Sequence, residues 1–229
     1  MNRKNVQNLL KLAPLELLVT AIVFLLSLFT FSFIVHEAVY GQEDVFDNKV
    51  IHFFSIHATP GLVNTMQKIT FLGSTTFLLP AYLALIAWLL VRKKTQHAIE
   101  TAVIALSSTG MMFALKEFFH RERPQMPIIK DIGGYSFPSG HSLSSFIFCS
   151  ILIYLVQKSN LPSLGKCLLI IFLLLLALTI GLSRIVLNVH YATDVIGGFC
   201  LGIIWVILSF AIFKKMRRNK AVVNDELHS

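Results

Sequence analysis

The chain has 229 residues, of which 55% are hydrophobic and only 14% are Asp, Glu, Lys or Arg. This composition excludes an ordinary soluble protein and predicts an all-α integral membrane protein in which residues 1–229 form one domain. The formal net charge is +8, but Lys and Arg gather at the ends of apolar runs, so the charge carries topology information and predicts no nucleic-acid partner. Cys149, Cys167 and Cys200 lie in or beside apolar runs without CxxC or His-rich spacing, which predicts neither a disulfide framework nor a metal site.

Six apolar runs are long enough to cross a bilayer as helices. They cover about Leu15–Val35, Phe71–Val91, Ile99–Phe119, Ser139–Val156, Cys167–Val186 and Thr193–Phe213. The polar stretch between the first two runs, from His36 to Thr70, contains Phe46–Ile56 and Leu62–Ile69, which mix apolar and polar residues at helical spacing. We expect short helices lying in the membrane interface there, although a plain loop fits nearly as well.

An even number of spans puts both termini on one side of the membrane. The Lys and Arg of the N-terminal segment and of residues 92–94, 158–166 and 214–220 all fall on that side. The positive-inside rule makes it the cytoplasm. We therefore expect a multi-pass protein of the cell membrane, with the stretches 116–141 and 184–194 together near the outer face.

The stretch Ser183–Asp194 reads S-R-I-V-L-N-V-H-Y-A-T-D and stands between two strongly apolar runs. If His190 and Asp194 begin one helix, their i, i+4 spacing places them on one face, and the carboxylate can fix the imidazole tautomer and leave the other ring nitrogen free to attack. Arg184 offers a planar fork for an oxyanion such as phosphate. Taken alone, the stretch fits equally well a snorkelling Arg, an interfacial His and a helix-capping Asp.

Two further pieces add to this pattern. Lys116 and Arg123 occur in K-x6-R-P at the end of the third run, and Ser139, Gly140 and His141 occur in P-S-G-H at the start of the fourth. Three converging cations form an oxyanion pocket, and a Ser-Gly turn into a helix adds backbone N–H groups and the positive end of a helix dipole. Gly140 lacks a Cβ that would block a ligand. Two histidines can divide the roles of nucleophile and general acid.

These three motifs, K-x6-R-P, P-S-G-H and S-R-x5-H-x3-D, resemble the signature of the type-2 phosphatidic acid phosphatase superfamily, the lipid phosphate phosphatases. The match covers Lys116 to Asp194, about a third of the chain, and every specified position is present. The order of six spans is also similar to that of the bacterial membrane branch of the family.

The resemblance implies a role for each matched residue. His190 would be the nucleophile that forms a phosphohistidine, Asp194 its orienting partner, and His141 the group that protonates the leaving group and then helps to activate water. The phosphate oxygens would be held by Lys116, Arg123, Ser139, Gly140 and Arg184. The resemblance implies no metal ion or other cofactor. His120, Arg121 and Glu122 lie outside the specified positions, and we expect an exposed loop there, with contact to a substrate head group as the alternative.

The resemblance thus implies an enzyme whose partners are the bilayer and a lipid phosphate. We expect hydrolysis of phosphatidylglycerol phosphate to phosphatidylglycerol near the outer membrane face. Hydrolysis of undecaprenyl diphosphate is the alternative substrate reaction, and a transporter of a phosphorylated compound is the alternative of a different class. The motifs do not specify an oligomeric state.

Overall fold

The structure, a computed structural model, describes residues 3–41, 45–129 and 133–227, with side chains from Leu15 to Asn219. Within these ranges all the regular secondary structure is helical. The helices are α1 (Arg3–Ile34), continued by the π-helical segment η1 (Val35–Tyr40), α2 (Val45–His57), α3 (Pro60–Phe71), α4 (Thr75–Val91), α5 (Thr95–Phe119), α6 (Gly140–Gln157), α7 (Ser163–Val186) and α8 (Ala192–Leu227).

The prediction of six spans is confirmed, with boundaries shifted by a few residues at most ends. The segments long and apolar enough to cross a membrane are Leu15–Tyr40, Pro60–Val91, Thr95–Phe119, Gly140–Gln157, Ser163–Val186 and Ala192–Asn219. The largest shift is at the start of the second span, which begins at Pro60 rather than near Phe71.

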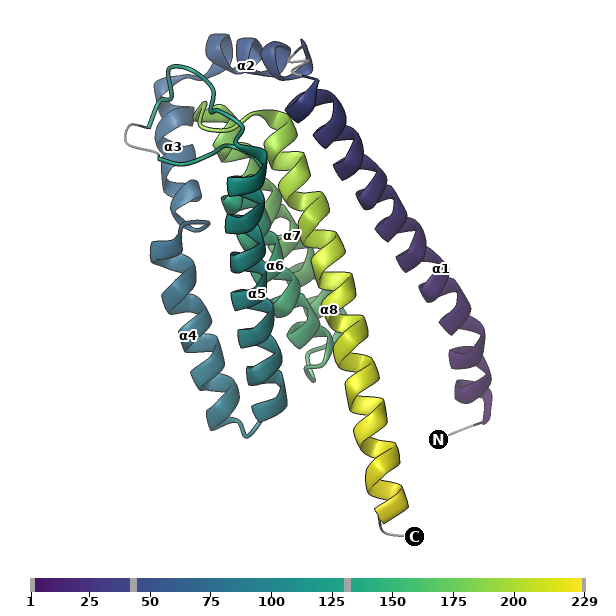
Figure 1. Cartoon of the computed structure of the whole chain (residues 1–229). Helices are drawn as coiled ribbons and strands as arrows, with labels where there is room; N and C mark the ends of the chain where they lie inside the picture. Colours follow the sequence, from purple (N-terminus) through teal and green to yellow (C-terminus); the bar gives the residue numbers. More distant parts are fainter. Residues whose placement is uncertain (1–2, 42–44, 130–132, 228–229) are drawn as a thin grey trace.

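Helices are present in both places where the polar stretch 36–70 predicted them. Helix α2 lies across one end of the bundle, whereas α3 runs down from it and is followed by α4 (Figure 1). The chain turns between α3 and α4 at Gly73, and Ser74 begins α4 by accepting a hydrogen bond from the Phe77 N–H through its side chain. Helix α3 therefore forms the first part of the second span instead of lying flat beside it.

The connections between the helices lie at the two ends of the bundle (Figure 1). Helix α3 and the α5–α6 and α7–α8 connections lie at the end that carries α2, which we call the α2 end. The α4–α5 and α6–α7 turns, the start of α1 and the end of α8 lie toward the opposite end. The basic stretches 92–94, 158–166 and 214–218 consequently share the opposite end, as the topology prediction requires.

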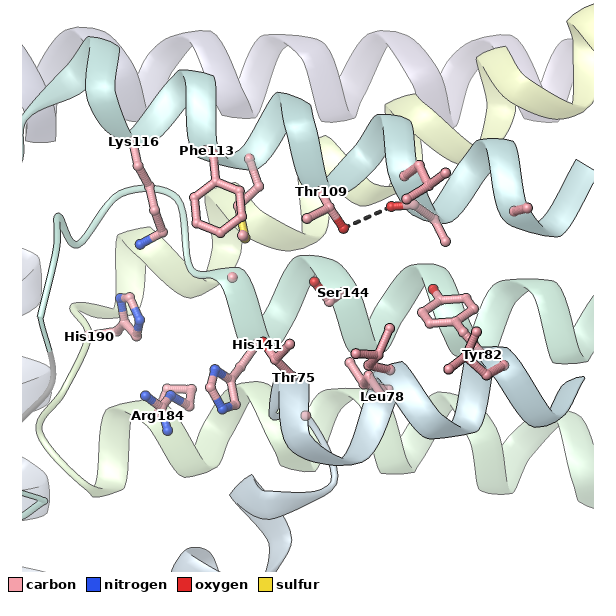
Figure 2. A pocket seen from close by; sticks show the side chains of 18 of the residues that line it. Thr75, Leu78, Tyr82, Thr109, Phe113, Lys116, His141, Ser144, Arg184 and His190 are labelled. Carbon is pink, nitrogen blue, oxygen red and sulfur yellow. Dashed lines mark hydrogen bonds between the residues drawn. The ribbon is translucent and has the colours of Figure 1, made fainter. Parts of the chain in front are cut away.

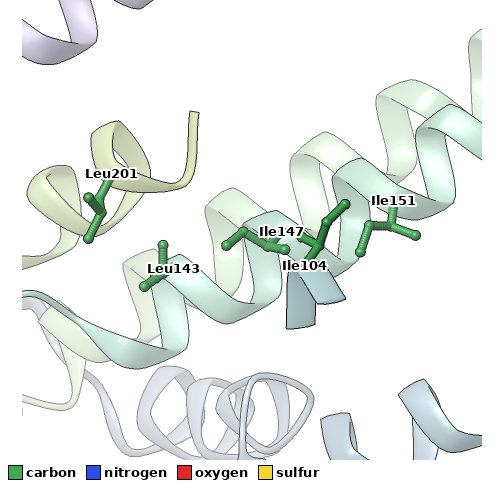
Figure 3. Packing of buried hydrophobic residues seen from close by; sticks show 5 residues of the cluster. All are labelled: Ile104, Leu143, Ile147, Ile151 and Leu201. Atoms are coloured by element: carbon green, nitrogen blue, oxygen red, sulfur yellow. The ribbon is translucent and has the colours of Figure 1, made fainter. Parts of the chain in front are cut away.

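Helix α6 lies at the centre of the bundle and contacts α4, α5, α7 and α8. Its apolar face forms a core with one residue of α5 and one of α8 (Figure 3). The members of this core are Ile104, Leu143, Ile147, Ile151 and Leu201. Gly198 allows α8 to approach closely, because a Cβ there would lie 2.8 Å from the Ser139 carbonyl oxygen of the α6 cap. This close packing joins the starts of α6 and α8, which carry two of the three motifs.

Candidate active site

The first turn of α8 holds Asp194 in a fixed position. Tyr191 precedes the helix, and its N–H donates to Asp194 Oδ2 at 2.9 Å, an arrangement in which an acidic side chain in the first turn reaches back to the cap. His190 Nδ1 lies 3.2 Å from the same oxygen. Ser136, from the α5–α6 connection, also donates to Asp194 Oδ2. The i, i+4 pairing of histidine and carboxylate predicted from the spacing is therefore present, with both side chains fully buried or nearly so.

The contacts of His190 define its tautomer. Arg123 Nη1 lies 3.2 Å from His190 Nε2, and because a guanidinium only donates, Nε2 must accept and the ring proton is on Nδ1, facing Asp194. Burial is the main effect that lowers the pKa of His190 to about 4, against the opposing hydrogen bond and charge of Asp194. At neutral pH the ring is therefore uncharged, with a lone pair on Nε2, which is the state that a nucleophile needs.

The α5–α6 connection holds the two cations of the first motif. Arg123 Nε donates to the Gly134 carbonyl at 3.0 Å, and its Nη1 donates to the Val189 carbonyl at 2.8 Å. Lys116, in the last turn of α5, donates through Nζ to the Tyr135 carbonyl. Backbone carbonyls thus orient both side chains before any anion binds.

The second motif forms the start of α6. Ser139 caps the helix, and its Oγ, fully buried, lies 3.0 Å from Ser142 Oγ and accepts from the Ser142 N–H. Its hydroxyl is thus used as a helix cap, so a direct bond to phosphate stays a prediction. Gly140 lies against the cavity described below, and the atom that a Cβ there would meet first is Met112 Sδ, at 2.6 Å. The missing Cβ therefore also allows α5 and α6 to pack closely.

Arg184 lies in the last turn of α7, where a cation interacts favourably with the helix dipole. Its Nη1 donates to Thr70 Oγ1 of α3 at 2.7 Å. Among the described residues, its buried Nε has no hydrogen-bond partner. A buried, unsatisfied guanidinium N–H is costly in a resting protein, which is consistent with a site that receives an anion.

A cavity of about 610 Å³ connects these residues. Six of the predicted site residues line it, and the four labelled in Figure 2, Lys116, His141, Arg184 and His190, lie together toward one end of it. The six are Lys116, Arg123, Gly140, His141, Arg184 and His190. Asp194 lies behind His190, fully buried. The rest of the cavity runs between α4 and α5 and is lined mainly by apolar side chains, including Leu78 and Phe113.

The expectation of an exposed loop at 120–122 is wrong for Arg121, whose side chain is buried. Its Nη1 donates to Asp194 Oδ1 at 2.7 Å and its Nη2 donates to Asp47 Oδ2 at 2.9 Å. Burial opposes the charge of Arg121, but the two carboxylates outweigh it and raise the pKa of the guanidinium. His120 and Glu122 are exposed as expected.

Sequence reasoning also missed Asp47, Ser136 and Thr193, which all bond to this network. The pattern of α2 contains a signal for Asp47. Val50, Ile51 and Phe54 follow it at i+3, i+4 and i+7, so the carboxylate lies on the apolar face of its helix, where an acidic residue needs a partner.

Comparison with known proteins places this site in a family. The model of the PAP2 superfamily matches residues 97–218, which include all three motifs, and the chain therefore belongs to that superfamily and is a membrane-embedded phosphatase. The family match favours the phosphatase over the transporter alternative.

Individual relatives agree. Phosphatidylglycerophosphatase B of Bacillus subtilis is 32% identical over 161 residues, covering 69% of this chain and 79% of the relative. The crystal structure of a transmembrane PAP2-type phosphatidylglycerolphosphate phosphatase from Bacillus subtilis superimposes with a TM-score of 0.73 at 29% identity, covering 86% of this chain and 96% of that one. The structure of Aquifex aeolicus LpxE is similar with a TM-score of 0.54 at 26% identity, covering 71% of this chain and 93% of that one.

Proposed function

We propose that the chain hydrolyses the terminal phosphate of a membrane lipid, with phosphatidylglycerol phosphate as the preferred substrate. The observation that carries this proposal is the cavity, which joins a cationic end to an apolar groove. At about 1.5 Å per residue, the lining stretch of α4 from Thr75 to Ile86 runs for about 17 Å. Leu83 and Leu106 on its walls are more than half exposed, so the groove opens toward the hydrocarbon.

Such a site suits a ligand with a charged head and an apolar chain. Lys116, Arg123 and Arg184 attract the phosphate. The groove between α4 and α5 receives part of the lipid's apolar chain without moving it into water. The two relatives from Bacillus subtilis carry names that specify phosphatidylglycerol phosphate, and this similarity supports the choice of head group. Three cations beside an apolar groove would also accept a diphosphate on a prenyl chain, which makes undecaprenyl diphosphate the second candidate.

The geometry supports a two-step mechanism. His190 Nε2 attacks phosphorus, the bond from phosphorus to the leaving oxygen breaks, and His141 gives that oxygen a proton. Asp194 accepts the Nδ1–H bond throughout and stabilises the positive ring that forms. In the second step His141 takes a proton from water, water attacks the phosphohistidine, and inorganic phosphate leaves with Nε2 free again.

The cations stabilise the charge that spreads over the phosphoryl oxygens during transfer. Arg123 Nη1, which donates to Nε2 in this structure, would exchange that nitrogen for a phosphate oxygen when substrate binds. The Gly140 N–H and Ser139 complete the proposed phosphate site. Because side chains and helix α6 supply the positive charge, we propose that the reaction needs no divalent metal. By the positive-inside rule, we also propose that the α2 end faces outward from the cell membrane.

The test is phosphate release by the purified chain in vesicles. The panel contains phosphatidylglycerol phosphate, undecaprenyl diphosphate, phosphatidic acid and a soluble diphosphate, each assayed with and without EDTA. We expect the highest kcat/KM for phosphatidylglycerol phosphate and no effect of EDTA. A soluble phosphate that outperforms every lipid would contradict the lipid specificity, and activity lost in EDTA and restored by Mg²⁺ would contradict the metal-independent mechanism.

A further inference from the structure

Asp47 brings helix α2 into contact with the proposed catalytic pair, although the three sequence motifs do not include it. It lies in the first turn of α2, and its side chain is 1% exposed. Arg121 bridges Asp47 Oδ2 at 2.9 Å and Asp194 Oδ1 at 2.7 Å. The guanidinium also lies 4.3 Å from the centre of the Tyr191 ring, a distance typical of a cation–π contact. One buried arginine therefore joins the carboxylate behind His190 to a carboxylate on another helix.

The same carboxylate caps α8. Asp47 Oδ1 accepts from the Thr193 N–H at 3.0 Å, and Oδ2 accepts from Thr193 Oγ1 at 2.5 Å. The N–H groups of the first helical turn have no partner inside their own helix, so capping from another helix fixes where α8 begins. Asp194 is the next residue along this turn. Asp47 thus holds the backbone of the turn, and Arg121 holds the Asp194 side chain.

The charges of this group also suit the reaction. Two carboxylates and one guanidinium leave a net charge of −1 behind a His190 ring that is neutral in the resting structure. When Nε2 bonds to phosphorus, the ring becomes positive, and a nearby net negative charge in a buried site stabilises it. Without the Asp47 charge, Arg121 and Asp194 would cancel each other, and the growing charge on His190 would have less compensation.

We propose that Asp47 and Arg121 are positioning residues for the nucleophile, so that docking of α2 onto the bundle is required for full activity. The pair acts through Asp194 and Thr193 and not through contact with the substrate. This inference rests on the proposed function, in which His190 attacks the phosphate.

The experiment compares Asp47→Asn and Asp47→Glu with the wild-type chain in vesicles that contain phosphatidylglycerol phosphate. The outer partners of metal-binding histidines typically contribute 10–100-fold to metal affinity or activity. We expect an effect of the same order here, so that Asp47→Asn lowers kcat by about 10–100-fold. KM should stay within about threefold, because the phosphate ligands are untouched. Asp47→Glu keeps the charge and should recover at least part of the lost kcat. The rate of covalent phosphoenzyme formation in a single turnover should fall by the same factor as kcat.

Glu100→Gln is the matched control, since Glu100 is also a buried carboxylate that faces an arginine, Arg217, at the opposite end of the bundle. If Asp47→Asn cannot be purified in folded form, Thr193→Val replaces it. This variant removes the hydroxyl that donates to Asp47 and accepts from Arg121 Nη1 at 2.7 Å, and it leaves every charge in place. A lower kcat at constant KM in that variant supports the inference.

The outcomes separate the inference from the function on which it rests. A wild-type chain that releases no phosphate from any lipid overturns the proposed function. An active wild type with unchanged kcat in Asp47→Asn, or in Thr193→Val if that variant is needed, overturns the positioning role alone. An equal loss of kcat in Glu100→Gln also overturns it, because the loss would then follow from weakening the fold in general.

Discussion

A histidine, a carboxylate and an arginine meet at both ends of the helical bundle. At the α2 end, His190, Asp194 and Arg121 form such a group. At the opposite end the same residue types are His97, Glu100 and Arg217. In both groups the histidine Nδ1 lies 3.2 Å from a carboxylate oxygen, and the two are spaced at i, i+4 or i, i+3 on the chain. By residue type and histidine–carboxylate distance alone, the two groups are nearly equivalent.

The two groups differ in the size of the cavity beside each histidine. The cavity beside His190 measures about 610 Å³ and contains three further cations, whereas the cavity beside His97 measures about 10 Å³. The smaller space holds at most about one water molecule and cannot admit a phosphate. The group around Glu100 instead ties α5 to α8, where Arg217 also donates to Tyr154 of α6 at 3.1 Å. The chemistry of the α2 end therefore comes from the cavity and its cations, and not from the histidine–carboxylate pair alone.

The largest effect should come from replacing the proposed nucleophile. His190→Ala removes the only proposed nucleophilic atom and should lower kcat by more than about 10⁴-fold, as the loss of a nucleophile does in other hydrolases. Phosphate release in vesicles measures the loss, and thermal unfolding in detergent checks that the chain remains folded. A folded variant that keeps wild-type turnover would refute the assignment of the nucleophile.

Asp194→Asn should have the next largest effect. The amide cannot accept the His190 Nδ1–H bond with the strength of a carboxylate, and it does not stabilise a positive ring. We expect kcat to fall by about 10²–10⁴-fold with the cavity intact. Measured kcat and KM for the same lipid test this, and a change confined to KM would contradict the role of Asp194 in chemistry.

The apolar groove can be narrowed without touching the charged end. Ala105→Phe places a ring among the groove-lining residues of α5, and should lower kcat/KM for a long-chain lipid by about tenfold, or about 1.4 kcal/mol. A short-chain soluble analogue should be affected much less. Ala114→Phe is the matched control, since Ala114 is exposed on the opposite face of α5. An equal loss of kcat/KM for the long-chain lipid and the short-chain analogue would show that the groove does not receive the apolar chain of the lipid.

The smallest catalytic effect is expected at the opposite end of the bundle. Glu100→Gln should leave kcat within about twofold, because its histidine faces no ligand space. Weakening its bonds to His97 and Arg217 should cost about 1–3 kcal/mol of stability. Kinetic assays and thermal unfolding read these two effects separately. A large loss of kcat without a loss of stability would show that the two ends of the bundle are energetically coupled.

Local patterns in the sequence predict the membrane spans and much of the candidate site. Long apolar runs define spans because an uninterrupted helix is the simplest way to satisfy the backbone in hydrocarbon. Motif spacing at the ends of those runs was enough to bring Lys116, His141, Arg184 and His190 to one cavity. Each of these residues lies within a turn or two of a helix end, so its position follows from where the helix begins or ends.

Contacts between distant segments could not be predicted in the same way. Asp47 and Thr193 are far apart in the sequence, and no spacing rule links them. Arg121 lies in a polar, turn-rich segment whose composition favours exposure, yet two buried carboxylates hold it inside. Helix α3 places Thr70 against Arg184, whereas its other polar residues, such as Gln67 and Lys68, are exposed. Its sequence therefore has the mixture of polar and apolar residues that is also typical of an interfacial helix.

The proposed mechanism requires a covalent bond between phosphate and His190. Mass spectrometry of a reaction quenched during turnover, with phosphatidylglycerol phosphate in vesicles, would locate that bond. With undecaprenyl diphosphate, whose leaving group is a phosphate and depends less on a proton from His141 than an alcohol does, His141→Ala should raise the amount of trapped intermediate, because the group that activates water is missing. We predict phosphate on His190 and on no other residue, and none in His190→Ala. Phosphate found on another residue, or steady release by the wild type with no covalent phosphate in either the wild type or His141→Ala, would contradict the account.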